Sequence, residues 1–202
     1  MITIGLTGGI GSGKSTVTEF LESKNYKIID ADRISHEVTE KGSVTLKKLA
    51  LAFGDDIITA DGSLDRKKLA GIVFSDAEKK EILESIVTAE VINVCNRKCE
   101  EYKNAGTEKI IFVDAPLLFE CGMNKDMDYV WVVTADMDVR VERVMKRDCA
   151  DREDVIARIR NQMSDEEKIA GADDVIDNSK DLEALYSQVE ELIIKYGKKA
   201  EV

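Results

Sequence analysis

Short apolar runs alternate with longer amphipathic stretches along this chain of 202 residues. The stretches between the runs repeat their apolar positions with the period of a helix, so the pattern predicts strands separated by helices. Such alternation is typical of a parallel sheet with helices on both faces. The third and fourth runs are apolar without alternation, which predicts that they lie in the middle of the sheet. The predicted strands are Ile2–Leu6, Lys27–Asp30, Lys109–Asp114, Tyr129–Thr134 and Asp174–Ile176.

The interval between the second and third strands is too long for a simple crossover connection. It consists of mostly helical residues, and its last part, from Asp76 to about Asn104, has the pattern of one long helix. We therefore expect this interval, about residues 36–104, to contain a projecting helical lobe that holds a substrate. The apolar positions of the long helix that are expected to lie in the core are Leu83, Val87, Val91 and Val94 or Cys95.

The first strand runs into a glycine-rich segment with the spacing of a phosphate-binding loop. Residues 8–15 read GGIGSGKS and match the pattern G-x-x-x-x-G-K-[ST]. Closely spaced glycines let backbone N–H groups point at phosphate oxygens, and the helix that begins near Lys14 directs its positive dipole end at the same anion. We therefore expect a nucleoside triphosphate here, with Mg²⁺ on the Ser15 hydroxyl; the alternative is a glycine-rich turn with a surface lysine. The residues predicted to bind the phosphates are Gly11, Ser12, Gly13, Lys14, Ser15 and Thr16.

Three carboxylates lie at the ends of predicted strands, where α/β sheets place their ligand crevice. Asp30 and Asp32 lie where the second predicted strand ends, and Asp114 is the last residue of the third. A carboxylate at this edge can take a proton from an attacking hydroxyl group, or orient that group and help to hold Mg²⁺. For Asp30 and Asp32 the alternative is a helix N-cap. For Asp114 a water-mediated contact to Mg²⁺ and a structural bond to the phosphate loop both remain open.

Basic residues gather after the fourth strand, in a stretch with helical periodicity. An arginine can bind phosphate oxygens in a bidentate manner and neutralise charge on a transferred phosphoryl group, although acidic neighbours offer surface ion pairs instead. Arg143 and Arg147, four residues apart on one helical face, are predicted to meet the phosphoryl group. Because an open site would hydrolyse ATP, we expect the segment 140–162 to close as a lid. The basic residues are Arg140, Arg143, Lys146, Arg147, Arg152, Arg158 and Arg160.

Composition limits the possible partners. The formal net charge of −11 argues against a nucleic acid, because no extended basic stretch stands out. The 4 irregularly spaced cysteines and 1 histidine fit neither a paired zinc site nor a dense disulfide framework, so we expect buried thiols in a reducing compartment. Met1 leads straight into the first strand, and no stretch of about 20 apolar residues occurs. We therefore expect a soluble, cytoplasmic protein with small-molecule substrates and no membrane or obligate protein partner.

Taken together, the motifs resemble those of the dephospho-CoA kinase family over nearly the whole chain. The phosphate loop alone is generic, but its combination with Ile29-Asp30-Ala31-Asp32 and with the segment Asp114–Glu120 is highly specific. The fold expected from the pattern and the resemblance is a P-loop NTPase-type α/β fold: a parallel five-stranded sheet flanked by helices, with a helical substrate-binding lobe and a helical lid. Further similar segments are Phe53-Gly54, Asp61–Arg66, Arg143–Asp148, Arg158–Met163 and Ala172–Asn178.

The resemblance implies transfer of the γ-phosphoryl group of ATP to the ribose 3′-hydroxyl of dephospho-CoA, the last step of coenzyme A synthesis. It implies that Asp32 is the base or orients the hydroxyl group, and that Arg66 and the helical lobe help to hold the acceptor. We expect one kinase domain over residues 1–202, with its core at about 1–35 and 105–202. The predicted catalytic residues are Asp32, Lys14, Arg143 and Arg147, and the predicted substrate-binding residues are Asp30, Asp32, Arg66 and Asp114.

One departure from the family's pattern is visible. Where the family usually has a His-Pro pair in the helical lobe, this chain has Thr88-Ala89, which predicts an unbroken helix because a proline would remove a backbone donor. The single histidine, His36, lies one helical turn beyond Asp32 and either packs at the surface or faces the acceptor. Asp177-Asn178 either borders the adenine or forms a turn with Asn at its tip.

Two other functions remain open at this point. A kinase that acts on a nucleoside monophosphate has the same loop, sheet and arginine lid and differs mainly in its acceptor lobe. The combination of Asp30-Ala31-Asp32 with the segment Asp114–Glu120 favours dephospho-CoA. A nucleotide-dependent switch or ATPase that binds a protein partner predicts slow hydrolysis that needs no acceptor.

Overall fold

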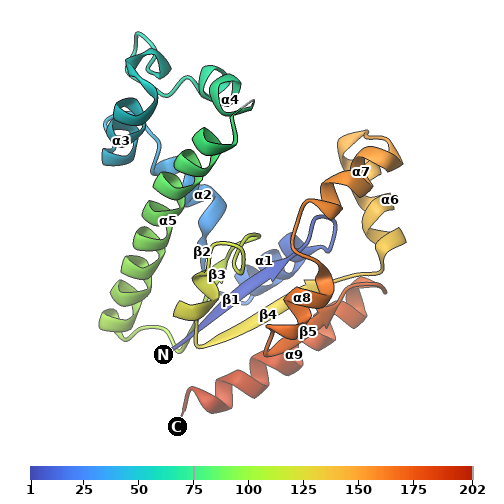
Figure 1. The fold of residues 1–202 in the computed structure, drawn as a ribbon. Helices are drawn as coiled ribbons and strands as arrows, with labels where there is room; N and C mark the ends of the chain where they lie inside the picture. Colours follow the sequence, from blue (N-terminus) through green and yellow to red (C-terminus); the bar gives the residue numbers. More distant parts are fainter. Residues whose placement is uncertain (75, 202) are drawn as a thin grey trace. The chain divides into compact units, whose positions relative to one another are not determined.

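The chain folds into two compact units. A computed structural model of the protein describes residues 1–74 and 76–201, and Figure 1 shows the course of the chain. The first unit comprises Met1–Ile29 and Cys99–Val202, and the second comprises Asp30–Lys98. The expected organisation as one kinase domain, with a core at about 1–35 and 105–202 and a lobe at about 36–104, stays a prediction.

Among the described residues, a five-stranded sheet has the order β2-β3-β1-β4-β5. The neighbours β1 and β3, β1 and β4, and β4 and β5 run parallel. All the predicted strands are confirmed, and the two fully apolar ones, β3 and β4, lie inside the sheet as predicted. The strands are β1 (Ile2–Gly8), β2 (Lys27–Asp30), β3 (Ile110–Asp114), β4 (Tyr129–Thr134) and β5 (Asp174–Asp177).

The strand register brings several loops to one edge of the sheet. Leu6 of β1 pairs with Asp114, the last residue of β3. Thr134, the last residue of β4, pairs with Asp177, the last residue of β5. Because parallel strands end at the same edge, the loops after β1, β3, β4 and β5 start close together, as expected for the ligand crevice of an α/β sheet.

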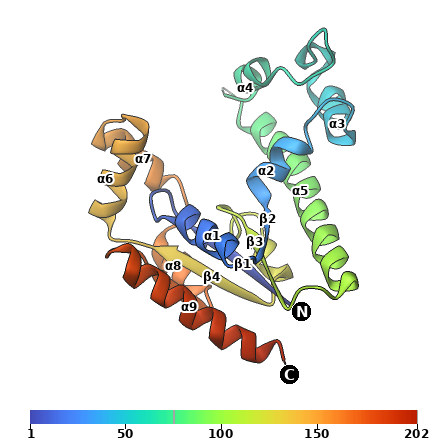
Figure 2. The same ribbon diagram turned by 180° about the vertical axis from the view of Figure 1, so that it is seen from behind.

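Two helices cover one face of this sheet and pack against each other: α1 (Lys14–Ser23) and α9 (Leu182–Lys199). Both can be followed in Figure 2. Leu21 of α1 and Leu185 of α9 are fully buried in the same core cluster as Trp131. The Tyr196 hydroxyl donates a hydrogen bond of 2.5 Å to Asp174, and burial together with this carboxylate raises the pKa of Tyr196. The contact anchors α9 to β5.

The remaining helices of the first unit follow β3 and β4. The helices after β4 are α6 (Met137–Asp148), α7 (Arg152–Arg160) and α8 (Asp165–Ala170), and a short 3₁₀ helix, η2 (Met123–Asp126), lies between β3 and β4. α6 and α7 pack on each other through a small apolar cluster. α8 contacts β4. The segment 140–162, predicted as a lid, therefore consists mainly of the α6–α7 pair.

The second unit is built from helices, apart from an isolated β-bridge between Ile58 and Leu64. Its helices are α2 (Ala31–Glu37), α3 (Val44–Phe53), η1 (Asp55–Ile57), α4 (Arg66–Phe74) and α5 (Ala77–Ala105), the last of which continues into the first unit. α5 runs through Thr88-Ala89 without a break, which confirms the predicted continuous helix. In the part of the chain that the structure describes, no helix is long and apolar enough to cross a membrane.

The cysteines differ from one another in exposure. Cys95 is buried, Cys99 and Cys121 are partly buried, and Cys149 is exposed. Burial raises the pKa of Cys99 to about 11. The expectation of buried thiols is therefore wrong for Cys149, because this residue follows the end of α6 in a left-handed conformation and does not continue the helix into the core.

Candidate active site

The phosphate loop has the backbone conformation that its glycines predict. Gly11 and Gly13 have φ angles of 80° and 87°, in the left-handed region that glycine adopts without a Cβ penalty. The N–H of Ser12 donates to the carbonyl of Gly9 at 3.1 Å. The loop leads directly into α1, which begins at Lys14 as predicted. The N-terminus of α1 is thus available to an anion.

Gly13 also lies against a segment from the far end of the chain. A Cβ atom on Gly13 would overlap the side-chain amide nitrogen of Asn178. This amide donates to the carbonyl of Ser12 at 2.8 Å, and Asn178 is buried. The N–H of Ser179 donates to the Asp177 carboxylate at 2.9 Å, so Asn178 is the middle residue of a side-chain turn, and its amide also supports the phosphate loop. Its contact with adenine stays a prediction.

Lys14 is held by a carboxylate at the end of β3. Its Nζ atom forms an ion pair with Asp114, which is buried, and the second oxygen of Asp114 accepts a hydrogen bond of 2.7 Å from the Thr18 hydroxyl. Of the two roles that the sequence left open for Asp114, the structure thus contains the bond to the phosphate loop. The bond fixes the ammonium group of Lys14 at the start of α1.

Two buried polar atoms near the loop have no hydrogen-bond partner among the described residues. They are the hydroxyl oxygen of Ser12 and Nη1 of Arg143. Nη2 of Arg143 donates to the backbone carbonyl of Asn178 at 3.0 Å, while Nη1 lies 3.7 Å from the position of a Cβ atom on Gly13. A buried donor without an acceptor is costly, and a phosphate oxygen is a suitable acceptor for a guanidinium group. The structure therefore places an available donor beside the loop.

Arg147 has different surroundings from Arg143. Its side chain is 60% exposed, and its Nε atom donates to the carboxylate of Asp148 at 2.7 Å. Arg158 of α7 donates to the same carboxylate at 2.7 Å. These two hydrogen bonds hold the pKa of Asp148 well below its usual range. Of the two predicted arginines, only Arg143 lies against the phosphate loop in this structure.

The predicted lid segment is connected to the phosphate loop at both of its ends. At its C-terminal end, the side chain of Gln162 accepts a hydrogen bond of 2.9 Å from the N–H of Ile10. At its N-terminal end, Val141 and Val144 of α6 form a cluster against which the Ile10 side chain packs. A motion of this segment stays a prediction.

Three candidate residues of the second unit belong to α2 or cap it. Asp30 caps this helix, because its carboxylate accepts a hydrogen bond of 2.9 Å from the N–H of Arg33; the N-cap alternative is thus realised for Asp30. Asp32 is exposed in the first turn of α2. His36 is exposed as well, which agrees with a surface position. The functional roles of these residues stay predictions.

A cavity of about 390 Å³ lies in the second unit, with mostly apolar walls from α3, α4 and α5. Arg66 borders it and donates a hydrogen bond of 2.8 Å to the hydroxyl of Thr39. Thr88, which stands where the family usually has histidine, also borders it. Leu83 and Val87 line the cavity and pack, partly buried, against the hydrophobic core cluster of the second unit, which agrees with their predicted place in the core.

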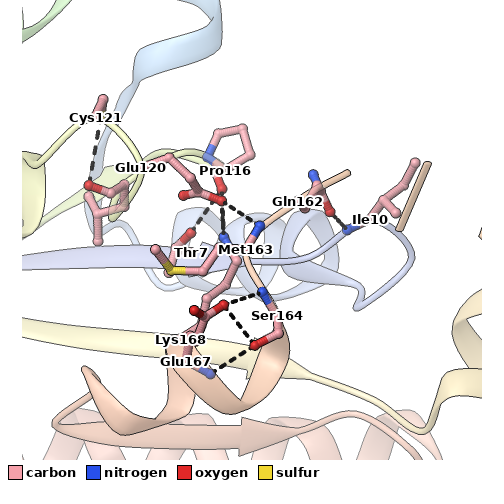
Figure 3. A network of polar contacts seen from close by, with 11 residues as sticks. Thr7, Ile10, Pro116, Glu120, Cys121, Gln162, Met163, Ser164, Glu167 and Lys168 are labelled. Carbon is pink, nitrogen blue, oxygen red and sulfur yellow. Dashed lines mark hydrogen bonds and ion pairs between the residues drawn. The ribbon is translucent and has the colours of Figure 1, made fainter. Parts of the chain in front are cut away.

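A buried lysine that sequence reasoning missed joins α8 to the segment after β3 (Figure 3). The side chain of Lys168 is fully buried, and its Nζ atom donates to Glu120 at 2.6 Å and to the carbonyl of Pro116 at 3.5 Å. The Thr7 hydroxyl donates to the same carbonyl, and the N–H of Met163 donates to Glu120. In the sequence Lys168 follows three acidic residues on a short helix and has the pattern of a surface position.

The fold and the loop define the class of protein. A parallel sheet with a glycine-rich phosphate loop between β1 and α1 is the P-loop fold of nucleotide-dependent kinases. The solved structure of shikimate kinase from Bacteroides thetaiotaomicron shares this fold, with a TM-score of 0.51 and 15% sequence identity over 95% of this chain and 96% of that one.

More specific matches identify the family. The family model for dephospho-CoA kinase matches residues 2–184. The dephospho-CoA kinase of Fusobacterium nucleatum subsp. nucleatum is 44% identical over 190 residues, which cover 94% of this chain and 96% of that protein. The structure of dephospho-CoA kinase from Campylobacter jejuni has a TM-score of 0.75 and 28% identity, covering 98% of each chain. The chain belongs to the dephospho-CoA kinase family. The predicted fold class, enzyme class and function in coenzyme A synthesis are thereby confirmed.

Because Lys168 and Glu120 form a buried ion pair, replacing only the lysine should lower stability more than replacing both residues. Lys168→Met leaves the Glu120 carboxylate without its partner, and breaking a buried ion pair typically costs 3–5 kcal/mol. We expect this variant to lower the free energy of unfolding by about 3 kcal/mol. The double variant Lys168→Met/Glu120→Gln should lose less, because glutamine is uncharged and still accepts from Met163. Urea denaturation measures both values.

The exposed pair of Lys24 and Glu190 provides the control. Lys24→Met removes the same charge from the surface, so the free energy of unfolding should change by less than about 1 kcal/mol. An equal loss in the single and double variants at Lys168 and Glu120 would show that packing, and not the unpaired carboxylate, causes the effect.

Proposed function

We propose that the chain transfers the γ-phosphoryl group of Mg²⁺·ATP to the ribose 3′-hydroxyl of dephospho-CoA with the residues described above. The observation that carries this assignment is the buried Nη1 atom of Arg143, which has no partner among the described residues and lies beside the glycine loop. A buried donor next to such a loop and a helix N-terminus suits a chain of phosphates. The identity of the acceptor is supported by membership of the dephospho-CoA kinase family.

On the nucleotide side, the phosphates are proposed to bind at the start of α1. The buried hydroxyl of Ser12 offers a further polar atom to them. Lys14, held by Asp114, and Arg143 then meet the negative charge that spreads over the oxygens of the transferred group. The proposed phosphate-binding residues are Gly11, Ser12, Gly13, Lys14, Ser15 and Thr16.

The hydroxyl of Ser15 is the proposed ligand of Mg²⁺. It is an oxygen donor on an exposed residue in the first turn of α1, and Mg²⁺ prefers oxygen ligands. This ion usually takes one or two protein ligands and completes its shell with water and substrate phosphates. The described residues suit that mode, because they contain no group of three or more His, Cys, Asp or Glu side chains able to hold a metal. When bound, Mg²⁺ would neutralise charge on the phosphate oxygens, and Asp114 is proposed to help to hold it.

On the acceptor side, the second unit is proposed to bind dephospho-CoA. The apolar walls of the 390 Å³ cavity suit the uncharged arm of this molecule, and Arg66 offers a guanidinium group to its phosphates. The exposed carboxylate of Asp32 is proposed to orient the 3′-hydroxyl group and to take its proton. Asp30 fixes the first turn of the helix that carries Asp32, through its bond to the N–H of Arg33.

Closure of the segment 140–162 is proposed to exclude water during the transfer. The segment is connected to the phosphate loop by its hydrogen bond to Ile10 and by packing against the Ile10 side chain. Phosphate binding and closure therefore both involve the backbone around Ile10. The chain is proposed to act in the cytoplasm, where ATP is available.

A panel of acceptors tests the proposed reaction. The chain should form ADP from Mg²⁺·ATP when dephospho-CoA is added, and mass spectrometry should find one added phosphate on the product. Nucleoside monophosphates and a control without acceptor should give little ADP. Turnover on a monophosphate, or on water at the same rate as with dephospho-CoA, would reject the proposed acceptor.

Replacing Asp32 tests the proposed base. Asp32→Asn should reduce kcat by roughly 10²- to 10⁴-fold while leaving ATP affinity unchanged, which is the usual weight of a general base. The control is Asp181→Asn, because Asp181 is also an exposed aspartate at a helix N-terminus and asparagine retains its capping bond. Turnover of Asp32→Asn within a factor of about three of the unsubstituted protein would remove Asp32 from this role.

The two arginines of α6 should respond differently to substitution. Arg143→Met removes the donor beside the phosphate loop, so we expect kcat to fall by about 10²- to 10³-fold, as for the loss of a group that stabilises the transition state. Arg147→Met removes mainly a bond to Asp148, and kcat should fall by less than about tenfold. Steady-state kinetics with both substrates measures the two values. An equal loss in both variants would mean that Arg147 also meets the phosphoryl group during turnover.

A further inference from the structure

Arg140 differs from the other arginines after β4 because its side chain is almost completely buried, with 4% exposed. A guanidinium group keeps its charge at all pH values relevant to proteins, so its burial requires acceptors on the protein. The Nε atom of Arg140 donates to the backbone carbonyl of Ile10 at 2.9 Å, and Nη1 forms an ion pair with Asp165. These donors are therefore directed at the protein and not at a ligand.

The contacts of Arg140 with the phosphate loop involve three consecutive residues, Gly9, Ile10 and Gly11. A Cβ atom on Gly9 would overlap the Nη2 atom of Arg140, and a Cβ atom on Gly11 would lie 2.7 Å from the backbone carbonyl of Arg140. The glycines on either side of Ile10 thus allow the loop to lie directly against this residue.

Both backbone polar groups of Ile10 are held by side chains. Its carbonyl accepts from Arg140, and its N–H donates to the side chain of Gln162 at 2.9 Å. These two hydrogen bonds fix the orientation of the peptide groups before and after Ile10. The direction of the following N–H groups in the loop depends on that orientation, and those groups are the proposed phosphate donors.

Asp165 holds the guanidinium group of Arg140 in place. It is the first residue of α8, directly after the Ser164 N-cap, whose capping box with Glu167 fixes the start of that helix. The carboxylate of Asp165 also accepts a hydrogen bond of 3.3 Å from the hydroxyl of Thr134, at the end of β4. The carboxylate is therefore positioned from the sheet as well as from α8.

We propose that Arg140 is a positioning residue, which holds the phosphate loop in its ATP-binding conformation through the carbonyl of Ile10, and that Asp165 holds Arg140. This inference rests on the proposed binding of ATP at the loop. Arg140 itself contacts no phosphate. Its contribution is preorganisation, because a loop that is already ordered loses less conformational entropy when the nucleotide binds.

The test measures the Kd for Mg²⁺·ATP together with kcat and the KM for each substrate. Arg140→Met should weaken ATP binding by about 10- to 100-fold and raise the KM for ATP, while the KM for dephospho-CoA stays unchanged. Arg140→Lys retains the charge for Asp165 but cannot reproduce both bonds, so its loss of ATP affinity should be intermediate. A merely structural role would lower thermal stability without this selective change, so all assays are run well below the unfolding temperature of each variant.

If Arg140→Met folds poorly, Asp165→Asn provides a second way to measure how much the contacts of Arg140 contribute to ATP affinity. It should also weaken ATP binding. The double variant Arg140→Met/Asp165→Asn should bind ATP no more weakly than Arg140→Met alone, because both substitutions remove the same interaction. The matched control is Arg152→Met, which breaks an exposed Arg–Asp ion pair with Asp138 between α6 and α7. Its ATP affinity should equal that of the unsubstituted protein.

Three results would overturn the inference. One is unchanged ATP affinity in Arg140→Met, Arg140→Lys and Asp165→Asn. Another is a large loss of kcat in Arg140→Met with intact ATP affinity, which would make Arg140 a residue that contacts the reacting group. The third is an equal loss of affinity in Arg152→Met. Failure of the unsubstituted protein to bind ATP or to phosphorylate dephospho-CoA would instead reject the proposed function, so the two failures are distinguishable.

Discussion

The phosphate loop has few side chains with which to hold its own shape, and the organisation of the first unit follows from this constraint. Glycine lets the backbone curl around an anion, but the same freedom makes an isolated loop costly to order. The order comes from side chains that follow later strands: Asn178 bonds the carbonyl of Ser12, and Gln162 and Arg140 bond the two polar groups of Ile10. A parallel sheet makes this possible, since its strands deliver their following segments to one edge.

Three buried or partly buried cations of the first unit each form an ion pair with a carboxylate from another segment. Asp114 pairs with Lys14, Asp165 with Arg140 and Glu120 with Lys168. Arg143 departs from this arrangement, because one of its buried nitrogens has no partner among the described residues. The cost of an unpaired buried donor therefore distinguishes Arg143 from Arg140 and Lys168, whose buried charges are neutralised by carboxylates of the protein.

The proposed function assigns different tasks to the two units. The fold of the chain is shared with shikimate kinase at 15% identity, and the proposed nucleotide site lies in the first unit. The second unit carries the cavity bordered by Arg66 and Thr88, and the helix that presents Asp32. In the proposed function, selection of the acceptor depends on the helices that surround this mostly apolar cavity, and not on the phosphate loop.

The sequence by itself determined the strands, the phosphate loop, the continuous helix through Thr88-Ala89 and the family, because each depends on local periodicity or on fixed spacing along the chain. The tertiary structure alone decided which charged residues are buried. Arg143 and Arg147 have the same pattern on one helix, yet only Arg143 lies against the phosphate loop. Lys168 has the pattern of a surface residue and is fully buried, and Asn178 reaches a residue 166 positions away. Burial is a property of packing between segments distant in sequence, and such packing leaves no local signal from which these partners could have been predicted.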